Sequence, residues 1–180
     1  LWICMVEFDS LGFYNGGETA GASQRHKHLQ VVPLPLTARG PRIPMEPVLE
    51  TASFHGPVGT SDRLPFVHAV TRIPPRILRG TAAEAAAFLH QGYGSMLEAC
   101  APGSEDASRG QRQAWPYNLL VTREWMLLVP RSREKFGPVS VNGLGFAGGL
   151  LVKNDDEMQH VRKAGPMEVL RSVGVPPAGR

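Results

Sequence analysis

Cysteine is scarce in this chain. The 180 residues contain two cysteines, Cys4 and Cys100, which lie far apart and have no CxxC partner. This argues against a small secreted scaffold held by disulfides and against a structural zinc site, because such sites use closely spaced ligand pairs. We therefore expect a reduced, cytoplasmic protein, and a single disulfide between the two cysteines is the alternative.

Long apolar runs are also missing. No stretch approaches the roughly 18 consecutive apolar residues of a membrane span, and the first residues lack the basic, apolar and small-residue order of a signal peptide. We expect neither a membrane partner nor secretion. The chain begins with Leu1 rather than methionine, so we expect a fragment or a processed product.

Positive charge is absent from residues 1–24, which contain three acidic residues and no lysine or arginine. Residues 25–80, by contrast, contain eight basic and three acidic residues. A basic middle suits a polyanionic ligand, although a solvated arginine-rich surface explains it equally well. Aromatic residues make up 7% of the chain and do not interleave with the basic ones, so no nucleic-acid partner is expected.

With 42% hydrophobic residues, the 180-residue chain can bury one substantial core, and we expect one domain over residues 1–180. Its 20 glycines and 16 prolines indicate long loops, which we place at about 33–65 and 101–114, the second a mobile loop. Thr81 and Glu84 form a capping box before a helix that ends near Ala99.

The remaining hydrophobic pattern predicts short strands and a few helices. We expect the end of a helix over 1–11, strands at 13–15, 26–36 and 66–73, a hairpin of 117–122 with 125–130, a glycine-rich strand over 144–153, and helices over about 155–162, capped by Asp155 or Asp156, and 167–173. This order predicts an α+β domain with an antiparallel sheet and flanking helices.

The segment most informative about chemistry is NGGETAGASQRHKHLQ, residues 15–30. In a strand, His26, His28 and Gln30 share one face, because successive side chains alternate. Just upstream, Gly21-Ala22-Ser23-Gln24 combines small residues, whose backbone N–H groups can approach an anion, with two side-chain donors. An imidazole beside such donors suits attack on phosphorus with stabilisation of the equatorial oxygens.

Other interpretations exist for each part of this segment. A His-x-His pair is commonly a metal-binding pair or two surface histidines, and Gly/Ser turns are frequent. A zinc ion would need further ligands, but the other histidines and cysteines show no matching spacing. We therefore expect no protein-held metal, and the combination within ten or so residues favours the catalytic interpretation.

The run NGG…GASQRHKHLQVVPLPL resembles the ATP adenylyltransferases, also called diadenosine tetraphosphate phosphorylases, a branch of the histidine-triad superfamily. The similarity continues at LPFVHAV, YNLLVTREWMLLVPR and NGLGFAGGLLVKN, and so extends from about Phe13 to Asn154. The resemblance implies a histidine-triad-like fold that is truncated at its N-terminus, because the family's upstream portion, which supplies at least one lysine, is not in this sequence.

The resemblance also implies roles for individual residues. His28 matches the family's nucleophile, which becomes a nucleotidyl-histidine, and His26 matches the histidine that orients and polarises it. Gln30 stands where hydrolytic members carry a third histidine. The implied substrate-binding positions are Asn15, Gly21, Ala22, Ser23, Gln24, Gln30, Asn142, Gly143, Leu144, Gly149 and Lys153. By residue type alone, Asn142 also suits a turn and Lys153 an ordinary strand end.

The implied reaction is phosphorolysis of diadenosine tetraphosphate to ATP and ADP, reversible, with phosphate as acceptor and Mg²⁺ or another divalent cation on the polyphosphate. Two departures stand out: Arg25 replaces a proline, and Gly149 replaces a larger residue, typically methionine, which puts base stacking there in doubt. The alternatives are a hexose-1-phosphate uridylyltransferase, which shares His-x-His-x-Gln, and a non-catalytic nucleotide-binding fragment. The sequence does not indicate the oligomeric state.

Overall fold

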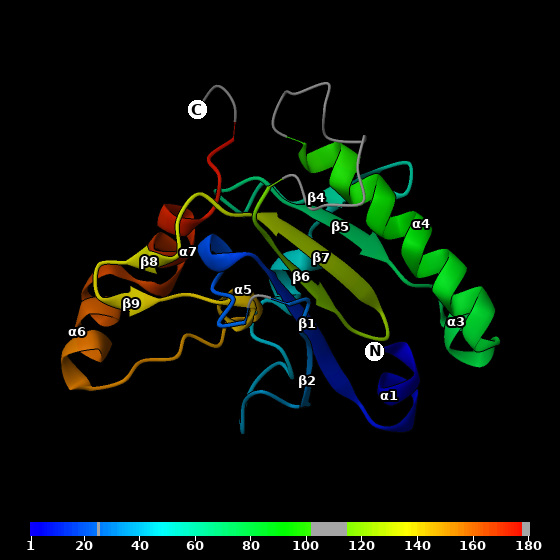
Figure 1. Ribbon diagram of the computed structural model, residues 1–180, viewed down its shortest axis with the longest axis horizontal. Coiled ribbons are helices and arrows are strands. Elements are labelled where there is room, and N and C mark those ends of the chain that lie inside the picture. Colours follow the sequence, from blue (N-terminus) through cyan, green and yellow to red (C-terminus); the bar gives the residue numbers. More distant parts are fainter. Residues whose placement is uncertain (25, 102–114, 178–180) are drawn as a thin grey trace.

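The core of the protein is one antiparallel sheet of seven strands, in the order β2-β1-β6-β7-β5-β4-β3. The structure is a computed structural model and describes residues 1–24, 26–101 and 115–177. Figure 1 shows the four central strands side by side. The strands are β1 (Ser10–Gly16), β2 (Leu29–Pro33), β3 (Ser53–His55), β4 (Val58–Thr60), β5 (Ala69–Arg72), β6 (Tyr117–Val121) and β7 (Trp125–Pro130); β8 (Lys135–Phe136) and β9 (Val139–Ser140) form a separate pair.

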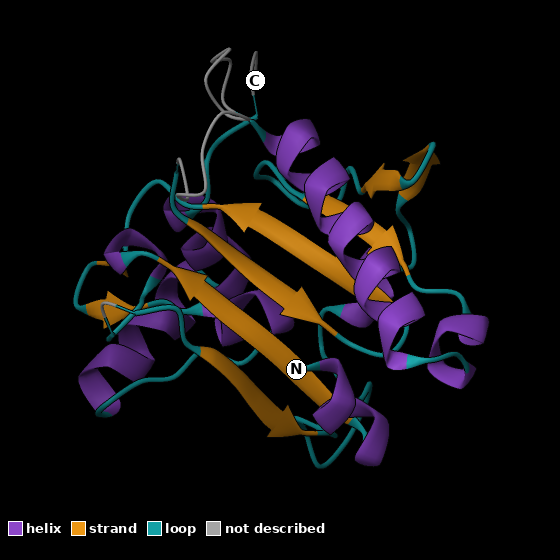
Figure 2. Cartoon of the chain, turned by 45° about the vertical axis from the view of Figure 1, so that its right-hand side comes forward, coloured by secondary structure: helices purple, strands orange, loops and turns teal. Residues whose placement is uncertain are grey.

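Helices cover both faces of the sheet (Figures 1 and 2). One buried cluster joins the sheet to α1 (Trp2–Glu7), α3 (Pro75–Arg79) and α4 (Ala82–Cys100), and a second joins its other face to α2 (Glu46–Leu49), α5 (Gly143–Ala147), α6 (Asp155–Ala164) and α7 (Pro166–Val173). This confirms the predicted α+β class. None of the helices in the described ranges is long and apolar enough to cross a membrane.

The long helix and the hairpin were predicted correctly because their signals are local. Thr81 caps α4: its hydroxyl accepts from the backbone N–H of Glu84 at 3.2 Å, and the Glu84 carboxylate accepts from the Thr81 N–H at 2.7 Å. The hairpin of β6 and β7 pairs Leu119 with Leu128 in the expected antiparallel register. The last helix, α7, also lies where the pattern placed it.

Residues 144–153 are not a strand, so that prediction was wrong. Residues 143–147 form α5 instead, because the Asn142 side chain accepts from the Leu144 N–H at 3.0 Å and starts a helical turn. The next helix, α6, is capped by Asn154, whose side chain accepts from the Glu157 N–H at 2.9 Å, rather than by either aspartate.

Further boundaries differ from the prediction. The strand predicted at 66–73 is β5, Ala69–Arg72, and the helix predicted over 1–11 ends at Glu7. Strand β1 runs from Ser10 to Gly16, longer than the predicted 13–15. Strand β2 covers only Leu29–Pro33, so 26–28 precede it and 34–36 follow it. Residues 33–65 are not a bare loop, because they contain α2, β3 and β4. The predicted loop at 101–114 lies outside the described residues from 102 onward, as does Arg25.

The two cysteines are free thiols in different environments. Cys4 is exposed on α1, and Cys100 is buried at the end of α4. Burial raises the pKa of the Cys100 thiol to about 12, so this side chain packs as a small apolar group rather than reacting as a thiolate.

His68 holds the segment that leads into β5. The residue is 7% exposed; Nε2 accepts from the Ser61 N–H at 2.9 Å, and Nδ1 donates to the Phe66 carbonyl at 2.8 Å. Burial lowers the pKa of His68 below its ordinary value, an effect only partly opposed by its hydrogen bond to Phe66.

We expect the free energy of unfolding to fall as pH drops below about 6.5, the ordinary histidine value. The unfolded chain takes up this proton more readily than the folded one, so stability is complete above that pH and lost below it. Protonation also turns the Nε2 acceptor into a donor facing the Ser61 N–H, at a cost of about 1–3 kcal/mol. Urea unfolding at pH 7.5 and 5.5 measures this, and His68→Gln should flatten the difference while His90→Gln, on the exposed side of α4, should leave it intact.

Candidate active site

The return of the chain from β1 to β2 brings the predicted residues together. In the antiparallel pair, Phe13 lies opposite Gln30 and Tyr14 opposite Leu29, so the next pair along brings Asn15 toward His28. The connecting segment folds back over this end of the sheet through η1 (Glu18–Ala20). One hollow is consequently lined by Asn15, Ala22, Ser23, Gln24, His26, His28 and Gln30.

The two histidines are exposed at this hollow rather than buried in the core. Their ring centroids are 5.8 Å apart and the ring planes are nearly perpendicular, at 85°. Both rings lie just before β2, so the turn, and not strand alternation, places His26. The hollow has a volume of only about 10 Å³, and a polyphosphate would therefore lie over it rather than inside it.

Gly21 fixes the donor loop against the segment before α5. Its φ is +82°, and a Cβ there would come within 2.8 Å of the Val141 carbonyl oxygen and 3.0 Å of the Asn142 Cα. Only glycine fits both the left-handed backbone and this close approach. The predicted loop at 21–24 and the predicted residues at 142–144 are therefore neighbours, although more than a hundred residues separate them in sequence.

Asn15 connects the start of α5 to β6 by hydrogen bonds. Its Oδ1 accepts from the Gly143 N–H at 2.8 Å and from the Asn118 amide at 2.8 Å. Gly143 is buried close to Asn15, and Leu144 is half-buried at the start of α5. Asn142 acts as the cap of this helix, which agrees with its interpretation as a turn former.

Gly149 and Lys153 do not line the hollow. The Gly149 N–H donates to the Leu144 carbonyl at 2.9 Å, which attaches it to the end of α5. A Cβ at Gly149 would meet only ordinary contacts, the nearest at 3.4 Å, so the position has room for a larger side chain. The Lys153 side chain is exposed, and its backbone N–H donates to Glu157 at 2.9 Å. Their substrate-binding roles stay predictions.

Sequence reasoning missed two residues beneath the site, Asn118 and Arg131. Asn118 is 0% exposed and Arg131 is 3% exposed, and an Arg131 N–H donates to the Asn118 Oδ1 at 2.6 Å. Both interrupt otherwise apolar strand sequences, YNLLV and WMLLVPR. A polar residue in an apolar strand sequence needs a reason, as His28 did, and this was the signal in the sequence that could have indicated Asn118 and Arg131.

Among the described residues, the lining of the hollow offers imidazole, amide and hydroxyl side chains but no carboxylate. The backbone N–H groups of Gly21 and Ala22, predicted to approach an anion, donate instead to the Glu18 and Gly17 carbonyls at 2.8 and 3.1 Å. Within the described ranges, no three His, Cys, Asp or Glu residues gather as metal ligands. Because Mg²⁺ prefers carboxylate and phosphate oxygens, these side chains do not form a cage for it.

The family of the chain follows from comparison with known proteins. The family model described as the ATP adenylyltransferase C-terminal domain matches residues 62–176, and the Ap4A phosphorylase N-terminal domain matches residues 1–51. The chain belongs to the ATP adenylyltransferase family. In the structure the two matched stretches share one sheet, since β1 from the first pairs with β6 from the second.

Members of this family from Saccharomyces cerevisiae are similar over most of the chain. Diadenosine tetraphosphate phosphorylase 2 is 29% identical over 161 residues, which cover 84% of this chain and 47% of that protein. The crystal structure of yeast Ap4A phosphorylase Apa2 matches with a TM-score of 0.71 and 27% identity, over 96% of this chain and 58% of that one. The structure of Apa2 in complex with Ap4A gives a TM-score of 0.68 and 26% identity, over 93% and 55%. This adenylyltransferase-family chain thus spans about half the length of its relatives.

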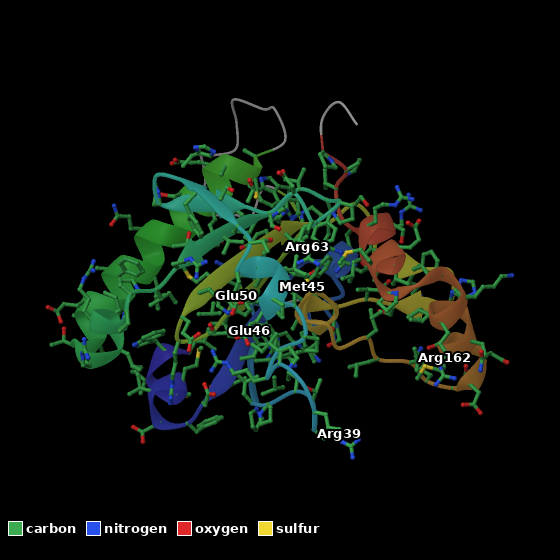
Figure 3. All side chains as sticks on the ribbon, turned by 180° about the vertical axis from the view of Figure 1, so that it is seen from behind. Arg39, Met45, Glu46, Glu50, Arg63 and Arg162 are labelled. Atoms are coloured by element: carbon green, nitrogen blue, oxygen red, sulfur yellow. The ribbon has the colours of Figure 1, made fainter. Side chains whose placement is uncertain are left out.

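Most of the described basic residues of the segment 25–80 lie away from the histidine hollow. Among the described residues, no lysine or arginine lines the histidine hollow. Arg39 projects away from the body, and Arg63 is likewise exposed (Figure 3). The solvated-surface interpretation therefore fits them better than the polyanion interpretation.

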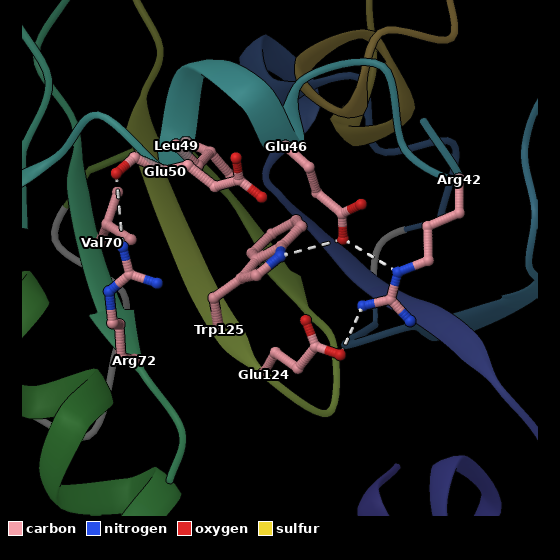
Figure 4. Close-up of a pocket in the computed structure, with 8 residues that line it drawn as sticks. All are labelled: Arg42, Glu46, Leu49, Glu50, Val70, Arg72, Glu124 and Trp125. Atoms are coloured by element: carbon pink, nitrogen blue, oxygen red, sulfur yellow. Dashed lines mark hydrogen bonds and ion pairs between the residues drawn. The ribbon is translucent and has the colours of Figure 1, made fainter. Parts of the chain in front are cut away.

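Arg42 serves a structural purpose at another cavity (Figure 4). This cavity, of about 290 Å³, lies between α2 and the strands near Trp125. Arg42 pairs with Asp9, Glu46 and Glu124 at 3.0–3.2 Å. Burial alone would lower the pKa of Arg42, but these carboxylates raise it. The Arg42 charge is thus compensated by carboxylates rather than available to a phosphate.

Gly21→Ala tests how the donor loop is placed. We expect it to lower the free energy of unfolding by about 1–3 kcal/mol and to weaken nucleotide binding, because the new Cβ strains a left-handed residue and displaces the loop from Val141. Gly40→Ala is the matched control: its φ is +89° but nothing lies within 4 Å of the added Cβ. Urea unfolding and titration with ATP compare the two variants, and equal effects on ATP affinity would contradict the docking of the loop.

Proposed function

We propose that this chain is a nucleotidyltransferase that phosphorolyses diadenosine tetraphosphate to ATP and ADP, reversibly, through an adenylyl-His28 intermediate. The observation that supports it is the exposed His28 ring in one hollow with the donor loop of Ser23 and Gln24, in a chain of the ATP adenylyltransferase family. The yeast relative of which this chain covers 47% is named as a phosphorylase of this substrate.

In the first step, an imidazole nitrogen of neutral His28 attacks the phosphorus next to one adenosine. The N–P bond forms as the bond from that phosphorus to the bridging oxygen breaks, and ATP leaves with the bond's electron pair. Imidazole suits this role because it is nucleophilic when neutral and a good leaving group when cationic. The ring of His26 lies 5.8 Å away and nearly perpendicular to the His28 ring.

In the second step, an oxygen of inorganic phosphate attacks the adenylyl phosphorus. The N–P bond breaks, His28 is released and ADP forms; the reverse sequence makes diadenosine tetraphosphate from ATP and ADP. The amide of Gln30, half-buried beside His28, does not accept a proton from water as an imidazole would. The intermediate therefore persists until phosphate arrives.

The charge on the equatorial phosphate oxygens needs fixed donors. Those at hand are the Ser23 hydroxyl, the Gln24 amide and the Asn15 amide, all at the hollow. Gly143 and Leu144 support this set through Asn15 and the Asn142 cap. A divalent cation such as Mg²⁺ would be held by the polyphosphate itself and would neutralise part of its charge.

The direct assay incubates the chain with diadenosine tetraphosphate and Mg²⁺, with and without phosphate, and separates the nucleotides. We expect ATP and ADP in equal amounts with phosphate, and at most one ATP per chain without it. Sustained release of AMP in both conditions would place the chain among the hydrolases and contradict the proposal.

A non-catalytic nucleotide-binding module is the second candidate, because the hollow is shallow and the chain spans 47% of a curated relative. It predicts saturable binding of ATP in calorimetry with no turnover and no covalent adduct. A cytoplasmic setting, inferred from the cysteine content, is part of the first proposal and is tested by cell fractionation.

A further inference from the structure

The Asn15 amide at the hollow is connected to a buried arginine through one side chain. In the register of the sheet, Asn15 lies directly opposite Asn118, and Asn118 lies opposite Val129. Arg131 is two residues beyond Val129, so its side chain lies on the same face of the sheet as Asn118. The three side chains form a row from the core to the site.

The direction of every hydrogen bond in this row is fixed by its buried end. A guanidinium can only donate, so the group that Arg131 meets at 2.6 Å must be the Asn118 Oδ1. The Asn118 NH2 then points the other way, to the Asn15 Oδ1 at 2.8 Å and the Ala20 carbonyl at 2.9 Å. The Gly143 N–H, also an obligate donor, meets the same Asn15 oxygen at 2.8 Å. The NH2 of Asn15 is consequently left to face the hollow.

Arg131 is a buried charge whose hydrogen bonds all go to neutral acceptors. Apart from Asn118, these are the backbone carbonyls of Ala20, Arg133, Glu134 and Val173. The guanidinium also lies over the Phe146 ring at 5.4 Å. In the described part of the chain no carboxylate is within ion-pair distance of it, and the Glu134 carboxylate accepts from Ser140 instead.

Such a charge is costly to bury unless something compensates it. Burial lowers the pKa of Arg131 to about 10, against an attraction from Glu134, so the group is still cationic at neutral pH. A nucleotide phosphate over the hollow would add a second anion to the Glu134 carboxylate that already attracts this charge.

We propose that Arg131 and Asn118 are positioning residues that set the polarity of the site: they hold the Asn15 NH2 toward the substrate phosphate and place a buried positive charge behind it. This rests on the proposed function only for the identity of the phosphate. The orientation itself is a property of the free protein.

We call the hydrogen-bonded row of Arg131, Asn118 and Asn15 the relay. Asn118→Asp tests it with little change in side-chain shape. The carboxylate still accepts from Arg131, as a buried ion pair, but it cannot donate to Asn15. Because a carboxylate attracts an NH2 group more strongly than a backbone N–H holds an amide oxygen, we expect the Asn15 amide to turn its NH2 inward, to lose its hydrogen bond from Gly143 and to present its oxygen to the phosphate. We expect kcat/KM for diadenosine tetraphosphate to fall about 10²-fold or more, mainly through kcat, because one donor to the developing charge is lost. The matched control, Asn154→Asp, keeps a good helix cap on α6 and should leave both stability and activity unchanged.

A double-mutant cycle separates positioning from general damage. Asn15→Ala removes the amide donor itself and should cost at least as much. If Asn118 acts through Asn15, the double variant of Asn15→Ala with Asn118→Asp should be no slower than Asn15→Ala alone. Additive losses would overturn the relay and assign Asn118 a merely structural role.

A measurement on the nucleotide-free protein tests the relay independently of turnover. In side-chain amide NMR of the free protein, the Asn118 NH2 should exchange slowly with solvent and the Asn15 NH2 rapidly, and Asn118→Asp should protect the Asn15 NH2. A protected Asn15 NH2 in the wild-type chain would overturn the relay even if the enzyme is active. A chain with the expected exchange but no reaction with diadenosine tetraphosphate would support the relay and refute the proposed function.

Discussion

His28→Ala should abolish adenylyl transfer, with a loss of at least about 10⁴-fold in the rate of diadenosine tetraphosphate phosphorolysis. Without the His28 imidazole, the remaining imidazole of the hollow is that of His26, which lies 5.8 Å away, and we do not expect it to reach the same phosphorus. The donors around the hollow would still bind nucleotide, so ATP affinity should change little. Steady-state rates with radiolabelled substrate and ATP titration by calorimetry measure the two quantities.

His55→Ala is the matched control for that variant. His55 is also an exposed histidine, but it lies on β3 at the opposite edge of the sheet, so its removal should leave the rate unchanged. His28→Ala with a rate within tenfold of the wild type would mean that another residue is the nucleophile.

Gln30→His should change the products rather than only the rate. An imidazole at position 30 can accept a proton from water, which an amide cannot. We expect AMP to form continuously from diadenosine tetraphosphate in the absence of phosphate, at a rate at least about tenfold above that of the wild-type chain. Chromatography of the products with and without phosphate measures the partition between hydrolysis and phosphorolysis.

The same substitution at an exposed glutamine controls for an added histidine. Gln159→His, on the outer side of α6, should give the wild-type products. If Gln30→His still yields only ADP and ATP, then something other than the absence of a base at position 30 prevents hydrolysis of the intermediate. The explanation of why the chain transfers to phosphate rather than to water would then be wrong.

The fold could be predicted from sequence where the signal is local. The capping box of Thr81 and Glu84 and the apolar repeat that follows it gave α4, and the two apolar runs around Thr122–Glu124 gave the hairpin. The failures came where local cues conflict with tertiary contacts. The stretch GLGFA contains three apolar residues and looks like part of a strand, but Asn142 caps it and buried Phe146 packs against Phe66 at 5.3 Å.

The candidate site divides in the same way. His26, His28, Gln30 and the donor loop lie within ten residues of one another, so their pattern indicates chemistry without any knowledge of the fold. The arrangement of Asn15, Asn118 and Arg131 depends on the order of strands β1, β6 and β7, which periodicity does not specify. Resemblance to the family supplied Asn142–Leu144 in advance; the contact of Gly21 with Val141 explains physically why they lie beside the loop.

The most direct test of the account is to find the covalent intermediate. The chain is mixed with diadenosine tetraphosphate in the absence of phosphate, quenched and digested, and the peptides are analysed by mass spectrometry. We expect one adenylyl group on the peptide containing residues 26–30, located at His28, which disappears with release of ADP when phosphate is added. An adenylyl group on any other residue, or turnover with no adduct at all, would contradict it.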